Sequence, residues 1–334
     1  MDVEVIHDAE TWDRVLTSMA YPPFTQLWAW GSVQETLGKR VIRLAVQMEQ
    51  GPIMAQWVQE RRGPFEYWFA PQGPVLARGI SVEQLNEFIV ACEKVLEVNW
   101  RTVFLRVEPR WRQSSDVISI GQPFLLPGAK RVKSMNPSTS FVVPLNGSTE
   151  QVFETFHKKT RYNIRLAEKH LVIVRGATEN DLPIFLRLMQ DTAKRDGFKP
   201  HSESYFRTLY RVLDASGQGR LRIAERLGKP LAANFEVLCG DTVMYLFGAS
   251  SSEEREQMAP YALQWSAIFA ATQEGKRWYD FGGGNPVDPK GFDFFPTWEG
   301  ITRFKERWGT LRVADAGTWD IAKRKLLYKG LVRR

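Results

Sequence analysis

Residues 279–284 read Tyr-Asp-Phe-Gly-Gly-Gly, and residues 302–305 read Thr-Arg-Phe-Lys. The first stretch is an aromatic strand that runs into three glycines, where the backbone can adopt positive φ and let a ligand approach the main chain closely. The second is an amphipathic turn on which Arg303 and Lys305 flank Phe304, whose ring we expect to be buried. A strand end, a glycine loop and a lysine together predict a cleft for an acyl or phosphate group.

The same order of elements occurs twice along the chain. In the first half we expect a helix at 26–37, strands at 41–48, 53–60 and 65–70, a helix at 82–98 and a strand at 102–108. In the second half we expect a helix at 203–214, strands at 221–226, 231–238 and 243–247, a helix at 259–273 and a strand at 277–281. Residues 52–56 align with residues 230–234 on either side of matching glycine turns, which indicates a duplicated module.

The repeated order is that of the acetyltransferase-like (GNAT) fold. We therefore predict an α+β chain of two tandem GNAT-like domains, each a mixed, mainly antiparallel sheet flanked by helices. The first domain is expected at 1–145 and the second at 146–316, with a helical stretch at 149–169 between the modules. A last basic helix at 319–331, within 317–334, is expected to pack back on the first domain.

Composition places the chain among globular proteins of a reducing compartment. It has 334 residues, of which 43% are hydrophobic and 25% charged. No apolar run reaches the roughly 18–20 residues that span a bilayer, and the acidic start has no signal-peptide pattern. Cys92 and Cys239 stand alone in apolar segments, which argues against disulfides and zinc. A cytoplasmic monomer is expected.

The net charge of +7 is concentrated in two places. The stretch 303–334 carries an excess as large as that of the whole chain, and 154–169 carries a smaller one. Such basic faces suit phosphate, RNA or anionic lipid headgroups, although lysines and arginines also simply solvate helices. The residues expected to contact RNA are Lys323, Arg324, Lys325, Lys158, Lys159 and Arg161.

The chemistry that the residues favour is direct acyl transfer. The four histidines have no metal-ligand spacing, and no nucleophile signature is present, so neither a metal nor a cofactor is expected. Lys305 is the candidate for stabilising an oxyanion, unless it is only a surface lysine whose removal hardly changes stability. Glu108 ends a strand and could accept a proton from an amine, unless it forms an edge salt bridge. Asp280 is expected to bond the Gly282 turn.

One loop bears on the coenzyme A alternative. Coenzyme A users of this fold place a glycine-rich run between the central strand and its helix, so that backbone N–H groups hold the pyrophosphate. The corresponding residues here, 250–260, contain no glycine and three glutamates. Binding of coenzyme A is therefore not expected.

The chain resembles the Fem family of tRNA-dependent peptidoglycan aminoacyltransferases over nearly its full length. The stretches that carry the resemblance are Lys-Lys-Thr-Arg-Tyr-Asn-Ile-Arg at 158–165, Ala-Pro-Tyr-Ala-Leu-Gln-Trp at 259–265, Tyr-Asp-Phe-Gly-Gly at 279–283, Phe304-Lys305, and Leu-Arg-Val-Glu-Pro at 105–109. Because there is no insertion for a helical arm, the chain is similar to the compact FemX-type form. The resemblance implies transfer of an amino acid from aminoacyl-tRNA to an amine of the stem peptide, on lipid II or on the UDP-linked precursor. It further implies a role in cell-wall synthesis and cell shape, with peripheral contact at the inner membrane surface.

The resemblance also implies roles for single residues. Lys305 matches the family's lysine after the glycine loop, and Glu108 stands where a compact relative has an aspartate near the acceptor amine. Tyr205 matches a tyrosine of the diphosphate site, whereas His201 and Phe247 stand in place of an arginine and a tyrosine. Arg303, Gly282 and Gly283 complete the expected substrate-binding set. The helix at 26–37 has no phosphate-gripping lysine, and with the two replacements this weakens the case for the UDP-linked acceptor.

Three alternatives stay open at this point. The first is a coenzyme A-dependent N-acyltransferase, against which the loop at 250–260 argues. The second is a non-enzymatic nucleic-acid-binding protein, against which the lack of a recognised reader motif argues. The third is an aminoacyl-tRNA-dependent transferase that acts on an amine outside peptidoglycan.

Overall fold

The computed structural model describes residues 1–109 and 126–332. The chain divides into two compact units. Unit 1 comprises Met1–Ser140, Asn285–Pro296 and Arg312–Arg334, and unit 2 comprises Phe141–Gly284 and Thr297–Leu311. The segment 285–296 therefore leaves unit 2 and returns to unit 1 before the chain completes unit 2.

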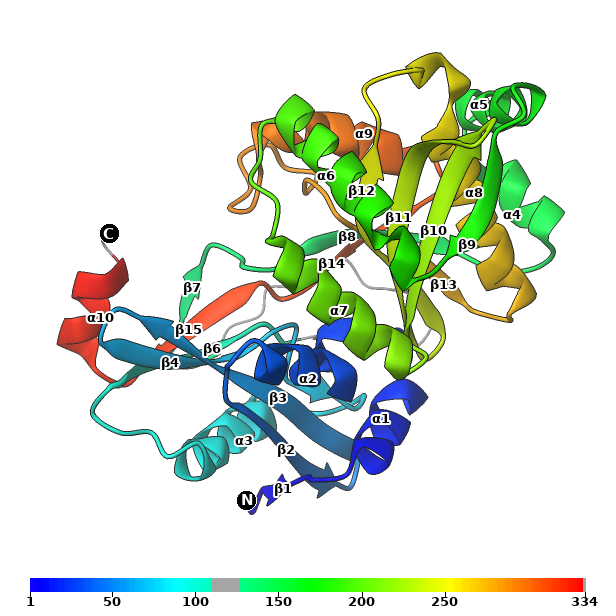
Figure 1. Cartoon of the computed structure of the whole chain (residues 1–334). Coiled ribbons are helices and arrows are strands. Elements are labelled where there is room, and N and C mark those ends of the chain that lie inside the picture. The colour runs from blue at the N-terminus through cyan, green and yellow to red at the C-terminus, as the bar shows by residue number, and fades with distance from the viewer. Residues whose placement is uncertain (110–125, 333–334) are drawn as a thin grey trace. The chain divides into compact units, whose positions relative to one another are not determined.

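Unit 1 is an eight-stranded sheet with helices on both faces (Figure 1). Its elements are β1 (Glu4–Val5), α1 (Ala9–Ser18), α2 (Trp28–Thr36), β2 (Val41–Met48), β3 (Gly51–Arg62), β4 (Phe65–Ala70), β5 (Val75–Leu76), α3 (Val82–Val95), β6 (Thr102–Val107), β7 (Lys130–Val132), β15 (Thr318–Ala322) and α10 (Lys325–Val332). The strand order is β1-β2-β3-β4-β6-β15-β7, and β5 pairs with β3.

Alternation along β2 and β3 assigns the two faces of this sheet. Leu44 and Trp57 face α3 and belong to the main core, together with Phe88 of that helix. Arg43 and Gln56, which lie opposite each other in register, face α2, and Arg43 Nε donates to Gln56 Oε1 at 2.8 Å. The period of two in each strand thus puts an apolar layer on one face and a bonded polar pair on the other.

Unit 2 is built on a second sheet. Its elements are β8 (Thr139–Pro144), α4 (Thr149–Thr155), α5 (Lys158–Lys169), β9 (Ile173–Ala177), α6 (Leu182–Asp196), α7 (Glu203–Ala215), β10 (Gly219–Arg226), β11 (Lys229–Cys239), β12 (Thr242–Ser250), α8 (Ala259–Gln273), β13 (Trp278–Gly283), α9 (Glu299–Glu306) and β14 (Leu311–Ala314). The strand order is β14-β8-β13-β12-β11-β10-β9. Helices α6 and α7 cover one face, and α8 with α5 covers the other (Figure 1).

The two units share one topology, as the duplicated pattern predicts. In unit 1 the chain runs α2-β2-β3-β4-α3-β6, and in unit 2 it runs α7-β10-β11-β12-α8-β13. The three consecutive strands pair antiparallel in each unit, and the strand after the helix pairs parallel with the third. The α+β fold with two GNAT-like domains is confirmed.

Two predicted helices are wrong in extent. The stretch 149–169 is two helices, because the chain turns extended at Phe156 and His157 between α4 and α5. Residues 319–322 are not helical but lie in β15, which pairs with β6 and β7. Trp319 is buried there against the α3 side of the sheet. Tertiary pairing overrides the helical pattern of these residues, and α10 begins only at Lys325.

Candidate functional site

At the centre of unit 2, the parallel strands β12 and β13 diverge after a short paired stretch. β12 and β13 pair only at Thr242 with Trp278, Val243 with Tyr279 and Met244 with Asp280. Both strands continue beyond these pairs, β12 as far as Ser250 and β13 as far as Gly283. Their carboxyl halves therefore present backbone groups that do not pair with each other. In open α/β sheets a gap of this kind at strand ends is a common place for a ligand.

The glycines after β13 have distinct structural requirements. Gly282 has a φ of +70°, and a Cβ there would lie 2.9 Å from Met244 Cε. A Cβ on Gly284 would lie 2.4 Å from the ring of Phe141. Asp280 Oδ1 accepts a hydrogen bond from the Gly282 N–H at 2.7 Å, as the sequence predicted. The loop is thus a compact turn with a fixed backbone.

Lys305 lies on the buried face of α9 rather than on its surface. Residues 302 and 305 are one helical turn apart and both face inward, and the Lys305 side chain is only 6% exposed. Its Nζ donates to the carbonyl oxygen of Gly283 at 2.5 Å. The alternative of a mere surface lysine is wrong, because the amphipathic turn of α9 points this residue to the core. Phe304 beside it is half-buried, and Arg303 is exposed.

Burial changes the acid–base chemistry of Lys305. Desolvation lowers the pKa of its amine from 10.5 to about 8, against the opposing attraction of Asp280. Only one of the three ammonium donors has a hydrogen-bond partner among the described residues. Buried amines with a lowered pKa occur often at functional sites, which makes Lys305 the candidate residue of this site.

The aromatic residues predicted to bind substrate lie together. The rings of His201 and Tyr205 are stacked with centroids 4.2 Å apart, and Phe247 approaches His201 edge-on at 5.8 Å. Burial lowers the pKa of His201 and raises that of Tyr205 to about 12, so both side chains are neutral at physiological pH. Phe206 contacts all three rings and was missed, since nothing in its sequence context separates it from core residues. The group lines β12 on the α7 side of unit 2.

Sequence reasoning also missed two buried polar pairs in unit 2, one between β13 and α8 and one between β10 and β11. Tyr279 donates through its hydroxyl to Gln264 Oε1 at 2.7 Å, and both side chains are almost fully buried. Glu236 is fully buried, and Arg222 donates to it at 3.1 Å. Burial raises the pKa of Glu236, while Arg222 opposes the rise. The detectable signal was Glu236 between the apolar residues Phe235 and Val237, because a buried charge requires a partner.

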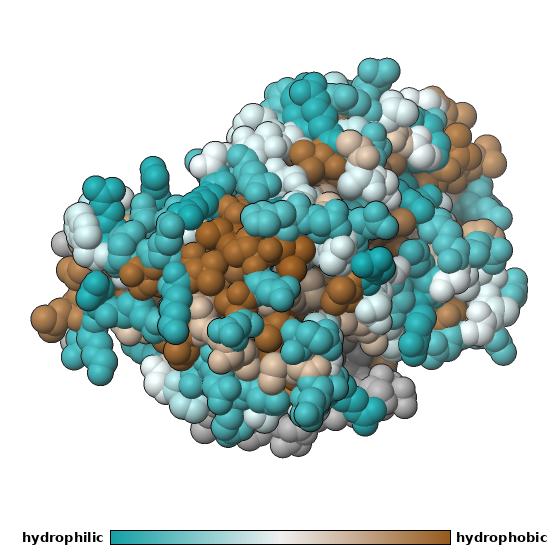
Figure 2. Space-filling view, turned by 90° about the horizontal axis from the view of Figure 1, so that it is seen from below, coloured by the Kyte–Doolittle hydropathy of each residue, from teal (hydrophilic) through white to brown (hydrophobic). Residues whose placement is uncertain are grey.

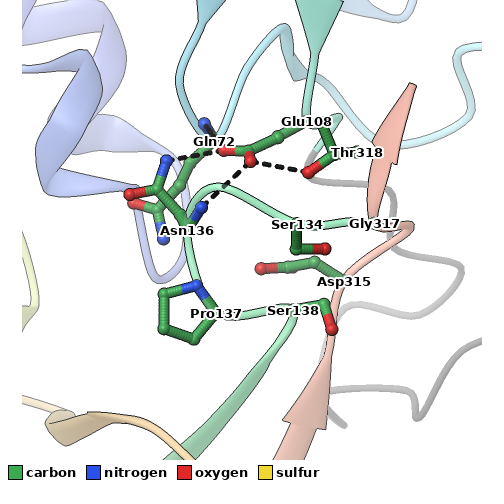
Figure 3. Close-up of a pocket in the computed structure, with 9 residues that line it drawn as sticks. All are labelled: Gln72, Glu108, Ser134, Asn136, Pro137, Ser138, Asp315, Gly317 and Thr318. Carbon is green, nitrogen blue, oxygen red and sulfur yellow. Dashed lines mark hydrogen bonds between the residues drawn. The ribbon is translucent and has the colours of Figure 1, made fainter. Parts of the chain in front are cut away.

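In unit 1, Glu108 is the centre of a hydrogen-bonded hub (Figure 3). Its Oε1 accepts from Thr318 Oγ1 at 2.7 Å and from the N–H groups of Met135 and Asn136 at 3.2 and 3.1 Å. Its Oε2 accepts from Asn136 Nδ2 at 2.6 Å and from the Gln72 N–H at 3.0 Å. Five donors from three segments of the chain thus hold one buried carboxylate. None of the ion pairs between residues that the structure describes involves Glu108, so the alternative of an edge salt bridge finds no support there.

The pocket beside Glu108 is small. Its free volume of about 10 Å³ is the space of a single water molecule, and Ser134, Ser138 and Asp315 line its other side. An amino group is the largest substrate fragment that fits there. Glu108 would have to release a donor before accepting a proton, because its oxygens are already occupied.

The basic residues predicted to contact RNA differ in availability. Lys158 and Lys159 are exposed on the first turn of α5. Arg161, by contrast, donates to the backbone carbonyls of Glu154 and Phe156. Arg324 and Lys325 are exposed, whereas Lys323 is hydrogen-bonded to Glu93. Only part of the predicted set therefore presents a free charge.

Two further structural findings concern cysteine and metal chemistry. Cys92 and Cys239 are both buried, and neither forms a disulfide. Within residues 1–109 and 126–332, no group of histidine, cysteine and carboxylate side chains could hold a metal ion. Nor does that part of the chain contain a helix with the length and apolar character needed to cross a membrane.

Comparison with known proteins identifies similar sequences and folds. The acetyltransferase (GNAT) domain family matches residues 155–293. A lipid II:glycine glycyltransferase of Staphylococcus haemolyticus is 22% identical over 259 residues, covering 58% of this chain and 61% of that protein. One from Staphylococcus aureus strain COL is 21% identical over 91% of this chain and 89% of its own length. The chain spans about three fifths of the length of the first curated relatives it matches. The crystal structure of FemX has a TM-score of 0.82 at 18% identity, covering 98% of this chain and 99% of that one.

Proposed function

We propose that this chain is a Fem-type aminoacyltransferase of peptidoglycan-bridge synthesis, a proposal supported by its likeness to the lipid II:glycine glycyltransferases and to the fold of FemX. In this proposal it moves an amino acid from aminoacyl-tRNA to an amine of a stem peptide, in the cytoplasm and as a monomer. The observation that carries the proposal is the buried amine of Lys305 at the parted strands of a GNAT-like domain. The acceptor is lipid II or its UDP-linked precursor, and lipid II appears in the names of the staphylococcal relatives.

The reaction requires charge stabilisation rather than a protein nucleophile. The acceptor amine attacks the ester carbonyl of the aminoacyl group, a C–N bond forms, and the C–O bond to the ribose breaks. The ammonium of Lys305 would stabilise the oxyanion with the donors that Gly283 leaves unused. With a pKa of about 8, this amine is mostly protonated at neutral pH, and it can give a proton to the leaving ribose oxygen and regain the one that the attacking amine loses.

Other residues would bind the two substrates. We assign His201, Tyr205 and Phe247 to the acceptor as an aromatic surface, since all three rings meet beside β12. Arg303, Gly282 and Gly283 would border the reacting groups. Glu108 would orient the acceptor amine through its small pocket. Peripheral contact with the inner membrane surface would follow from a lipid-linked acceptor.

Donor RNA would contact the exposed face of α5. Lys158, Arg165 and Lys169 are exposed along one helical stripe, and the ring of Tyr162, 61% exposed, lies between them. Cations with an interposed aromatic suit a phosphate backbone and an unstacked base. Lys159 and Arg161 adjoin this stripe.

Coenzyme A is a weaker donor candidate than aminoacyl-tRNA, because residues 251–258 do not suit its pyrophosphate. Glu253 and Glu254, bound by Lys229 at 2.8 Å each, lie just before α8. Carboxylates at a helix start repel a pyrophosphate that would need the same N–H groups. No glycine opens this loop to a ligand.

The test is a transfer assay with a defined donor. The protein is incubated with a pool of tRNAs charged with radiolabelled amino acids, and with lipid II or the UDP-linked muropeptide as acceptor. Label in the acceptor, dependent on charged tRNA and lost in Lys305→Ala, would support the proposal. Transfer from an acyl-coenzyme A instead, with none from charged tRNA, would refute it.

A further inference from the structure

Three segments that are distant in sequence meet at one end of the unit 1 sheet. The N–H groups of Lys323 and Arg324, which lead into α10, donate to the carbonyl of Val103 in β6 at 2.9 and 3.0 Å. Trp100 and Arg101 lie just before β6. With residues of the β3–β4 turn they line one surface hollow of about 280 Å³. We call α10 with the preceding Arg324, residues 61–64 at the end of β3 and in the β3–β4 turn, and residues 100–101 the α10 end.

Large hydrophobic side chains are exposed at the α10 end. Leu326 is 86% exposed, Trp100 64% and Leu327 39%. Trp100 is the only exposed tryptophan among those that the structure describes. The opposite side of α10 is anchored, because Tyr328 is buried and donates to Asp320 Oδ2 at 2.9 Å. Anchoring by Tyr328 thus fixes an orientation that points Leu326 at solvent.

Positive charge surrounds these hydrophobic groups. The exposed cations of the α10 end are Arg61, Arg62, Arg101, Arg324, Lys325 and Lys329. In the described part of the chain, Arg61 alone of these six forms an ion pair, with Glu66 at 3.8 Å. The guanidinium of Arg101 lies 5.1 Å from the ring centre of Trp100. At the edge of the molecule where α10 lies, hydrophobic groups protrude among hydrophilic ones (Figure 2).

This combination fits a lipid surface better than RNA. RNA offers phosphates to cations and bases to aromatic rings, but it gives an exposed leucine nothing apolar to enter. At a bilayer surface, leucine and tryptophan enter the boundary of headgroups and acyl chains while lysine and arginine meet anionic phosphates. The hollow at Arg61 and Arg101 also contains Glu66, and its volume of about 280 Å³ has room for a headgroup phosphate beside the two guanidinium groups.

We propose that the α10 end docks the protein on an anionic phospholipid bilayer. This proposal rests on the proposed function, because docking on a bilayer brings the enzyme to a lipid-linked acceptor. Arg324 and Lys325, which the sequence suggested as RNA contacts, become lipid contacts. The exposed face of α5 remains the proposed contact for RNA.

The charge contribution can be tested by a pair of matched triple variants of the full chain. The α10-end variant is Arg324→Ala, Lys325→Ala, Lys329→Ala. Its control carries Lys158→Ala, Lys159→Ala and Lys169→Ala on α5, which is the same change in charge. Co-sedimentation uses vesicles of phosphatidylglycerol mixed with phosphatidylcholine, and vesicles of phosphatidylcholine alone.

We expect each triple variant to lose one kind of binding and to keep the other. Each cation near an anionic surface contributes about fivefold to binding, so the α10-end variant should lose on the order of a hundredfold in affinity for the anionic vesicles. The α5 control should keep vesicle binding and lose affinity for tRNA. Equal loss of vesicle binding in both variants would mean a diffuse charge effect and would overturn the proposal. So would an α10-end variant that loses tRNA binding but binds vesicles normally.

The hydrophobic contribution has its own readout. Quenching of tryptophan fluorescence by brominated lipid should occur in the wild type and fall sharply in Trp100→Leu, with Leu227→Ala at an exposed hairpin tip as the control. An unchanged quench would exclude insertion of Trp100. For catalysis, Trp100→Ala with Leu326→Ala should lower the ratio of rates on lipid-linked and UDP-linked acceptors. Vesicle binding is measured without turnover, so failure of transfer with both acceptors would sink the proposed function and leave docking standing.

Discussion

Replacing Lys305 by methionine tests the burial of its charge. The shift of the Lys305 pKa from 10.5 to about 8 corresponds to about 3 kcal/mol of unfavourable folding energy when the amine is protonated in both states. Below pH 8 that cost is fully present. As pH rises from about 8 to 10.5, the folded state loses its proton before the unfolded state does, and stability rises. Lys305→Met removes this dependence.

The quantity to measure is the difference in unfolding free energy between Lys305→Met and the wild type. Near neutral pH the variant should be equal or more stable by about 1 kcal/mol, since relief of the buried charge outweighs the lost bond to Gly283. Between about pH 7 and pH 10 the difference should move by about 2.5 kcal/mol in favour of the wild type. Denaturant unfolding at both pH values gives the answer. A difference that does not change with pH would refute the assignment of a buried, charged amine.

Activity follows a separate expectation for the same residue. Lys305→Ala should lose on the order of 10²–10³ in kcat, as does removal of an oxyanion donor elsewhere. Lys305→Arg should recover part of this, because charge is kept and shape is not. The wild-type rate should fall above a pKa of about 8, and this basic limb should be absent in Lys305→Arg. A fully active Lys305→Ala enzyme would remove the lysine from the mechanism.

Three other outcomes are expected. Glu108→Gln turns an amide toward N–H donors and should lower the unfolding free energy by about 1–3 kcal/mol, measured by urea titration; an unchanged midpoint would mean that the hub is not formed. Lys158→Ala with Lys159→Ala should weaken tRNA binding and reduce the slope of log affinity against log salt by roughly 1–2, and an unaltered slope would place RNA elsewhere. Titration calorimetry with acetyl-coenzyme A should show no binding at millimolar ligand, whereas a micromolar dissociation constant would promote the N-acyltransferase alternative.

The sequence predicted the elements whose signal is local. The bounds of β2, β4 and α8 coincide with the expected strands 41–48 and 65–70 and helix 259–273. Period-two alternation and turn glycines specify hairpins without help from distant residues. The turn between β10 and β11, for example, has positive φ at both Leu227 and Gly228, as a two-residue hairpin loop requires.

What the sequence could not predict depends on distant partners. β15 takes its place beside β6, which lies more than two hundred residues earlier, and this pairing overrides a helical pattern. Thr318 reaches Glu108 across the same separation, so the donors of the hub have no signal in sequence spacing. The burial of Lys305 depends on which side of α9 faces the core. Because a lysine is normally assigned to the exposed side of a helix, the sequence pattern does not indicate that it is buried.

The duplicated modules differ at equivalent strand ends, and the difference bears on where the chemistry occurs. In unit 1, β4 and β6 stay paired to their last residues, Ala70 and Val107, and the next side chain, Glu108, closes the end with five hydrogen bonds. In unit 2, β12 and β13 part after three pairs, and the freed carbonyl of Gly283 is met by a lysine with donors to spare. A saturated carboxylate holds loops in place, whereas an unsaturated buried ammonium can bind a developing negative charge. The same fold therefore carries a closed strand end in one copy and an unsaturated one in the other, and this difference supports our proposal that acyl transfer occurs in unit 2 and positioning in unit 1.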